Sequence, residues 1–168
     1  MSFRKWTGIL LSLFVFFEIS GFGESPSAEE RLDLGNLSLD GIRLEESYED
    51  VIARVRASNQ SFEELSVVGE PERKAIRVTR EPSLYVRFKD DRVVQIAGAE
   101  TLADGSRVLV SVKDEPSRIF EIFGKPRRSE ESSYILYDYR DGGLAVRFSL
   151  TFDEDEILRI GIVRDTEI

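Results

Sequence analysis

Hydrophobic residues between positions 38 and 100 first recur at a helical spacing and then at every second position. Ser47 is a good N-cap, and an apolar stripe at i, i+3, i+4 and i+7 follows it: Tyr48, Val51, Ile52 and Val55. Ser61–Leu65 carries the start signature of a further short helix. From 76 to 96 the apolar residues alternate with polar ones, which predicts strands with one buried face. Residues 38–100 are therefore expected to form a helix followed by a three-stranded antiparallel meander.

The same order of patterns returns in residues 101–168. Apolar residues concentrate in Ile119–Phe123, which predicts a second helix. Strict alternation over Leu144–Phe152 predicts a strand, and Ile157–Val163 predicts a last one that closes the sheet. The stretch 108–112 alternates as well and predicts an additional edge strand before the second helix.

Parts of the two segments match at a constant offset. Three correspondences lie 64 residues apart: the Asp-Gly turns at Asp40 and Asp104, Phe88 with Phe152, and Ile96 with Ile160. A shared offset indicates an internal repeat. We predict an α+β fold of two tandem helix-plus-antiparallel-meander repeats packed side by side, with the first over 38–100 and the second over 101–168. The alternation assigns nine residues to the core: Val86, Phe88, Ile96, Ile119, Phe123, Val146, Phe148, Phe152 and Ile160.

Residues 1–23 have the organisation of a targeting segment. Arg4 and Lys5 precede an apolar run over residues 6–17, which has the length of a signal-peptide core and is short for a membrane span. The sequence predicts a cleaved signal peptide, with an uncleaved membrane anchor as the alternative, and a polar tether over 24–37. The protein is accordingly expected to be exported, to the periplasm or outside the cell, or anchored to the inner membrane if uncleaved.

Composition narrows the chemistry that the chain can perform. The sequence has no His and no Cys, which excludes His-based catalysis, thiolate nucleophiles and disulfides. We expect no enzyme activity, no catalytic residue, no cofactor and no metal. The best carboxylate pair for hydrolysis is Glu130 with Asp138, and its spacing does not distinguish it from other pairs. The acidic run 153–156 is expected to be a solvated turn, with weak calcium or magnesium binding as the alternative.

Charge and aromatic residues suggest a protein partner. A net charge of −9 disfavours nucleic acid and favours another protein, basic in character. If Tyr137 and Tyr139 point outward, they join Tyr85 and Arg147 in an aromatic surface of the type enriched at interfaces. These four residues are the predicted partner-binding site, and the alternative is that the tyrosines belong to the core or to an ordinary sheet surface.

The segment Ile119–Pro126 resembles a known family. Its sequence Ile-Phe-Glu-Ile-Phe-Gly-Lys-Pro is similar to the helix end of the small envelope modules called SmpA/OmlA (BamE-like), and Val51–Val55 keeps the same spacing. The tandem unit is also similar to the beta-lactamase-inhibitor-protein fold. The resemblance implies an exported, non-catalytic protein-binding module of the cell envelope or the secreted fraction. A membrane-tethered structural or assembly protein of the envelope is the alternative.

Overall fold

The structure is a computed structural model that describes residues 32–66 and 73–164, all within one compact unit, Leu32–Ile168. The first part of the unit contains the 3-10 helix η1 (Leu34–Asn36), strands β1 (Leu37–Leu39) and β2 (Ile42–Arg43), helix α1 (Tyr48–Ala57), and strands β3 (Phe62–Ser66), β4 (Arg73–Val78), β5 (Leu84–Lys89) and β6 (Arg92–Ala99). The second part contains strands β7 (Thr101–Asp104) and β8 (Arg107–Ser111), helix α2 (Ser117–Phe123), and strands β9 (Arg127–Glu130), β10 (Ile135–Asp141), β11 (Leu144–Leu150) and β12 (Ile157–Arg164).

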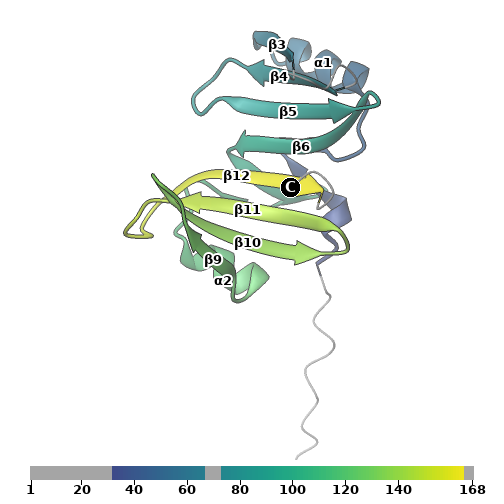
Figure 1. Cartoon of the computed structure of the whole chain (residues 1–168). Helices are drawn as coiled ribbons and strands as arrows, with labels where there is room; N and C mark the ends of the chain where they lie inside the picture. Colours follow the sequence, from purple (N-terminus) through teal and green to yellow (C-terminus); the bar gives the residue numbers. More distant parts are fainter. Residues whose placement is uncertain (1–31, 67–72, 165–168) are drawn as a thin grey trace, which may run out of the picture. The chain divides into compact units, whose positions relative to one another are not determined.

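The strands form two antiparallel sheets, and each sheet takes strands from both parts of the chain. The larger sheet has eight strands in the order β3-β4-β5-β6-β12-β11-β10-β9, and the smaller has four in the order β2-β1-β7-β8. The two parts meet where β6 pairs with β12 in one sheet and where β1 pairs with β7 in the other. In the view of Figure 1, α1 and α2 lie behind the eight-stranded sheet.

The expected α+β fold is therefore wrong, because the described residues are mostly β, with two large antiparallel sheets and two short α-helices. Two changes of assignment account for much of the difference. Ser61–Leu65, which carries a helix start signature, forms most of β3 because Phe62 and Leu65 pair with residues of β4. Each part also contributes four strands to the large sheet instead of three. Strand pairing overrides the local helix signal at β3.

One core lies between the helices, the small sheet and the inner face of the large sheet. Val51, Val55 and Ile119 from the helices join Leu39 and Leu102 from the small sheet in a single buried cluster. Of the nine core residues expected from alternation, seven are buried: Val86, Phe88, Ile96, Ile119, Val146, Phe148 and Ile160. Phe123 is half-buried against the same cluster.

Phe152 departs from the prediction, because its side chain is 57% exposed. It follows the end of β11, in the turn that leads to β12. The residue equivalent to Phe88 in the second half of the sheet is Phe148, not Phe152. Both residues follow the sequence Leu-x-Val-Arg, in β5 and β11, and both are buried. In the same way, Ile96 lies opposite Val86 and Ile162 lies opposite Val146. The predicted offset of 64 is wrong for both strand pairs.

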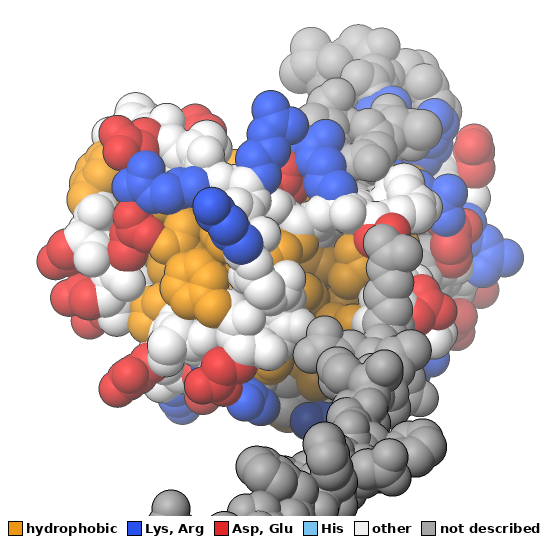
Figure 2. Space-filling model, turned by 90° about the horizontal axis from the view of Figure 1, so that it is seen from below, with side chains coloured by type: hydrophobic (Ala, Val, Ile, Leu, Met, Phe, Trp, Pro, Cys, Tyr) orange, Lys and Arg blue, Asp and Glu red, His pale blue; other side chains and the backbone are white. Residues whose placement is uncertain are grey.

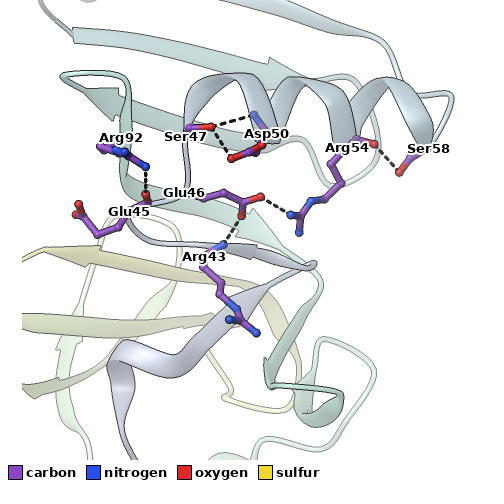
Figure 3. Close-up of polar contacts among 8 residues, drawn as sticks. All are labelled: Arg43, Glu45, Glu46, Ser47, Asp50, Arg54, Ser58 and Arg92. Atoms are coloured by element: carbon purple, nitrogen blue, oxygen red, sulfur yellow. Dashed lines mark hydrogen bonds and ion pairs between the residues drawn. The ribbon is translucent and has the colours of Figure 1, made fainter.

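Helix α1 begins as the sequence predicts. The Ser47 hydroxyl accepts a hydrogen bond from the Asp50 amide at 3.2 Å and donates one to its carboxylate at 2.6 Å, which satisfies an amide left free at the helix start. Just before the helix, the Glu46 carboxylate pairs with Arg54 and accepts the Arg43 amide (Figure 3). These contacts connect the β2 hairpin to the last turn of the helix.

The Asp-Gly turns also form as expected, between β1 and β2 and between β7 and β8. Asp40 has a positive φ of 50°. Its carboxylate accepts hydrogen bonds from the Glu100 and Thr101 amides at 3.0 and 2.9 Å and also pairs with Arg80. Asp104, at the corresponding turn, is exposed. One aspartate thus connects three segments of the fold, whereas the other only forms a turn.

The predicted targeting segment 1–23 and the first part of the predicted tether 24–37 lie outside the described residues. Within the described ranges, no helix is long and apolar enough to cross a membrane. The boundary expected near residue 100 falls between β6 and β7.

Candidate functional site

The two faces of the eight-stranded sheet have different surroundings. Side chains on the inner face, such as Val86 and Phe148, are buried against the helices and the small sheet. Neighbouring residues along each strand point the other way, so Tyr85, Arg87 and Arg147 lie on the outer face. No described helix or strand covers this face (Figure 1).

Two of the four predicted partner-binding residues lie on the inner face. Tyr137 pairs directly with Phe148 and Tyr139 with Val146, and residues that lie opposite each other in a sheet share a face. The tyrosines are only 3% and 9% exposed, respectively. The condition that they point outward is therefore not met. Their rings pack beneath α2, with centroids of Phe120 and Tyr137 5.4 Å apart and those of Phe123 and Tyr139 5.2 Å apart.

Burial has an electrostatic consequence for both tyrosines. Burial, reinforced by a hydrogen bond from its hydroxyl to Glu154, raises the pKa of Tyr137 to about 12. Burial also raises the pKa of Tyr139, whose hydroxyl donates to the carbonyl of Gly124 at 2.9 Å. Both side chains thus stabilise the fold, and neither presents an accessible ring to a partner.

The other two predicted residues, Tyr85 and Arg147, lie on the outer face in one row of residues that crosses all eight strands. From one edge to the other this cross-sheet row consists of Glu63, Arg77, Tyr85, Ala97, Gly161, Arg147, Asp138 and Arg127. Tyr85 and Arg147 are three strands apart, or about 14 Å at ~4.8 Å per strand. Only two small residues, Ala97 and Gly161, lie between them. The large residues on both sides leave a depression at the centre of the sheet.

A groove of about 190 Å³ occupies part of this depression. Ala97 and Gly161 contribute to its floor, and a Cβ at Gly161 would lie 3.1 Å from the Ile96 carbonyl oxygen. The groove is also lined by Arg147, Ser149, Arg159, Tyr134 and Leu136, all from β10 to β12 or the turn before β10. The guanidinium of Arg159 lies 5.1 Å from the centroid of the Tyr134 ring, so Arg159 reaches across β11.

Basic residues predominate on the outer face. At the outward strand positions the described residues include eight Arg or Lys: Arg73, Arg77, Arg87, Lys89, Arg127, Arg140, Arg147 and Arg159. The only acids at these positions are Glu63 and Asp138. Figure 2 shows Lys and Arg side chains gathered along the upper side of the molecule, where the face seen in Figure 1 is viewed edge on. A chain of net charge −9 therefore has one basic face.

Ion pairs neutralise part of this face. Glu63 pairs with Arg77 at 2.8 Å. Asp138, which is 7% exposed, accepts from Nε of Arg140 at 2.7 Å and from Nε of Arg147 at 3.5 Å. Among the described residues, Arg87, Arg127 and Arg159 form no ion pair with a carboxylate, so the face keeps an excess of positive charge.

Other candidate sites have their charges paired within the fold. A second hollow, lined by Gly41, Arg43 and Arg54 among others, contains the Glu46–Arg54 ion pair shown in Figure 3. Glu130 and Asp138 lie on opposite faces of the sheet, since Glu130 pairs with the inward Ile135, so they do not form a carboxylate pair.

In the acidic turn 153–156, Glu154 pairs with Arg128 at 2.7 Å, and Asp155 accepts a 2.7 Å hydrogen bond from the Thr151 hydroxyl. The hydrogen bonds from Arg128 and Tyr137 lower the pKa of Glu154. Among the described residues, no three His, Cys, Asp or Glu side chains form a group that could hold a metal ion.

The comparisons with known proteins concern the fold alone. No family model matches the chain, and no curated protein does. The solved structure of a cysteine-rich secretory protein from Staphylococcus aureus is similar, with a TM-score of 0.54 at 8% sequence identity. The match covers 77% of this chain and 47% of the other, so the chain spans about half the length of that protein. The resemblance of Ile119–Pro126 to the SmpA/OmlA modules stays a prediction.

Sequence reasoning missed Ser149, Arg159 and Tyr134 as groove residues. A signal for Tyr134 and Ser149 exists in the Arg140–Gly143 hairpin turn. A two-residue turn at Gly142 and Gly143 fixes the register of β10 with β11. This register determines, for each residue of β10, whether it lies on the inner or the outer face.

Proposed function

We propose that the protein is an exported, non-catalytic binding module that holds an acidic segment of a partner protein on the outer face of its eight-stranded sheet. The observation that carries this proposal is the excess of Arg and Lys around a groove, on a face that no described helix or strand covers. Opposite potentials speed the encounter of two proteins and determine their orientation. The remaining surface of the protein is acidic, so it repels an acidic segment and restricts binding to the outer face.

The groove supports the proposal because it gives a ligand chain close access to the sheet. Small residues at Ala97 and Gly161 let a backbone approach, while Tyr85 and Arg147 on either side supply residue types that are enriched at interfaces. The partner charge differs from the expectation based on composition. Net charge favours a basic partner, whereas the distribution of charge favours an acidic one, because contact takes place at one face.

Synthetic peptides provide the direct test. Three acetylated and amidated ten-residue peptides alternate Ser with Glu, Gln or Lys, and their binding to the full chain is measured by titration calorimetry. The Glu peptide should bind, with an affinity that falls as salt is raised, because exposed charges are screened. The Gln and Lys peptides should bind at least about tenfold more weakly.

Preferential binding of the Lys peptide would contradict the proposal and would favour the basic partner that the net charge predicts. Equal binding of all three would contradict it as well, because charge would then have no role. A single-stranded DNA oligonucleotide serves as a further control, since a basic face can also attract phosphates. Tighter binding of the oligonucleotide than of the Glu peptide would assign the face to nucleic acid instead.

The second candidate function is a membrane-tethered structural protein of the envelope, which requires residues 1–23 to be retained. N-terminal sequencing of the mature protein separates the two. A start near Glu24 removes the tether, whereas an intact Met1 in the membrane fraction favours the structural role.

A further inference from the structure

We infer that the groove beside Arg147 is a specific pocket for one glutamate side chain of the acidic segment, with Ser149 as the hydrogen-bond donor and Arg159 as the nearby cation. This inference rests on the proposed function and adds the residue that the partner must supply. Three features of the groove lead to it: a hydroxyl that makes no hydrogen bond with a described residue, two arginines that line the same hollow, and a volume that suits one side chain.

Ser149 is the most specific of these features. It is 7% exposed, so more than nine-tenths of it is buried, and it lines the groove. It lies on the outer face, directly opposite Leu136 in β10 and Arg159 in β12. Its hydroxyl makes no hydrogen bond with any described residue. The hydroxyl is not among the buried side-chain atoms that lack a hydrogen bond, so it is open to the groove and available to a ligand that enters it.

The arginines determine the charge of that ligand. Arg147 and Arg159 both line the groove, and Arg159 extends across β11 to the Tyr134 ring. The cation–π contact holds the guanidinium beside the ring, and no hydrogen bond to a described residue occupies its N–H groups. The carboxylate near this pocket is that of Asp138, which already accepts from Arg140 and Arg147. An incoming carboxylate can therefore accept from Ser149 and from Arg159, and hydrogen bonds to a charged acceptor are the strong ones.

The size of the groove and the face around it indicate where the carboxylate comes from. A hollow of about 190 Å³ accommodates one side chain but not a folded element. The basic positions extend to the β4 and β5 strands, beyond the groove, so one acid of a longer acidic segment fits better than an isolated chain terminus. Leu136, half-buried at the groove wall, provides an apolar contact for the methylene groups of glutamate.

The test compares two serines in the same row of the sheet. Ser149→Ala removes the proposed donor without a change of charge, and Ser129→Ala is the matched control on edge strand β9, also opposite Leu136. Binding of the Ser-Glu peptide to each full-chain variant is measured by titration calorimetry. Ser149→Ala should weaken binding about tenfold, the usual effect of losing a hydrogen bond to a charged group, and Ser129→Ala should leave it unchanged.

Arginine variants provide the second arm, in case Ser149→Ala affects folding. Arg159→Gln and Arg87→Gln remove the same charge from the same face, but Arg87 does not line the groove. Arg159→Gln should weaken binding by a factor at least about threefold larger than Arg87→Gln does. Equal effects of the two variants, together with wild-type affinity for folded Ser149→Ala, would overturn the pocket while the proposed function stands.

The source of the carboxylate is tested with a peptide that has no Glu and a free C-terminus. If it binds as tightly as the amidated Glu peptide and loses affinity with Ser149→Ala, the pocket takes a chain terminus and the assignment to a side chain is wrong. If no acidic peptide binds the wild-type chain, the proposed function itself fails.

Discussion

The inner and outer faces of the eight-stranded sheet are made by alternate residues of the same strands, yet they have opposite physical characters. In β11, Val146 and Phe148 are fully buried in the core, whereas Arg147 and Ser149 between and after them face the groove. The inner face has an apolar environment that the helices and the small sheet complete. The outer face has unbalanced charge and an unused hydroxyl. Packing explains the inner residues, but it does not explain the outer ones, and this difference indicates where binding takes place.

The largest effect should come from the inner face. Phe148→Ala should lower the free energy of unfolding by ~3–5 kcal/mol, because it removes a buried ring and leaves a cavity. Urea denaturation provides the measurement, with Phe152→Ala as the control. The control removes the same ring from an exposed turn and should cost less than ~1 kcal/mol. Similar costs for the two variants would mean that the faces are not distinct.

Tyr137 provides the second comparison, because it was expected on the outer face and lies on the inner one. Its pKa of about 12 lies above the ordinary value of 10, so the folded chain keeps a proton that the unfolded chain releases. Its contribution to stability is therefore complete below pH ~10 and is lost as the pH rises toward ~12. Tyr137→Phe should reduce this alkaline loss, measured by urea denaturation at pH ~9 and ~11.

Tyr137→Phe should also cost ~1 kcal/mol near neutral pH, because the hydrogen bond to Glu154 is lost. The variant should leave affinity for the Ser-Glu peptide unchanged. Weaker binding by a normally folded Tyr137→Phe chain would mean that Tyr137 does take part in binding.

Ala97, a small residue on the outer face, should affect binding and not stability, in contrast to Tyr137. Ala97→Leu places a larger side chain on the groove floor, where it points to solvent, and should change the free energy of unfolding by less than ~1 kcal/mol. The same substitution should weaken binding of the Ser-Glu peptide at least about tenfold, because the ligand can no longer approach the sheet. Unchanged affinity would mean that the groove takes no part in binding.

The sequence predicts the inner face well and the outer face poorly, for physical reasons. Alternation of large apolar residues in β5 and β11 identifies Val86 and Phe148 as inward. In β10 both faces have apolar or aromatic residues, so alternation alone cannot decide whether Tyr137 or Leu136 points inward. The register with β11 decides it, and that register is fixed by the hairpin turn at Gly142 and Gly143, which the alternation does not describe.

The error at Phe152 has a similar cause. The alternation continues from Leu144 to Phe152, but β11 ends at Leu150. The Thr151 hydroxyl then accepts hydrogen bonds from the Asp155 and Glu156 amides at 3.3 and 3.2 Å and stabilises the turn.

The charge of the binding face could not be predicted from the net charge of the chain. Eight cations at alternate positions of several strands come together only when the sheet forms.

The binding of an acidic partner by the outer face is tested most directly by a comparison of two charge-matched double variants. Arg147→Gln with Arg159→Gln removes two cations from the outer face. Arg54→Gln with Arg118→Gln removes two from α1 and α2, where both side chains are about two-fifths exposed. Calorimetric titration with the Ser-Glu peptide at low salt should show at least about thirtyfold weaker binding for the outer-face variant and less than about threefold for the helix variant. Equal losses, or a larger loss for the helix variant, would contradict the account.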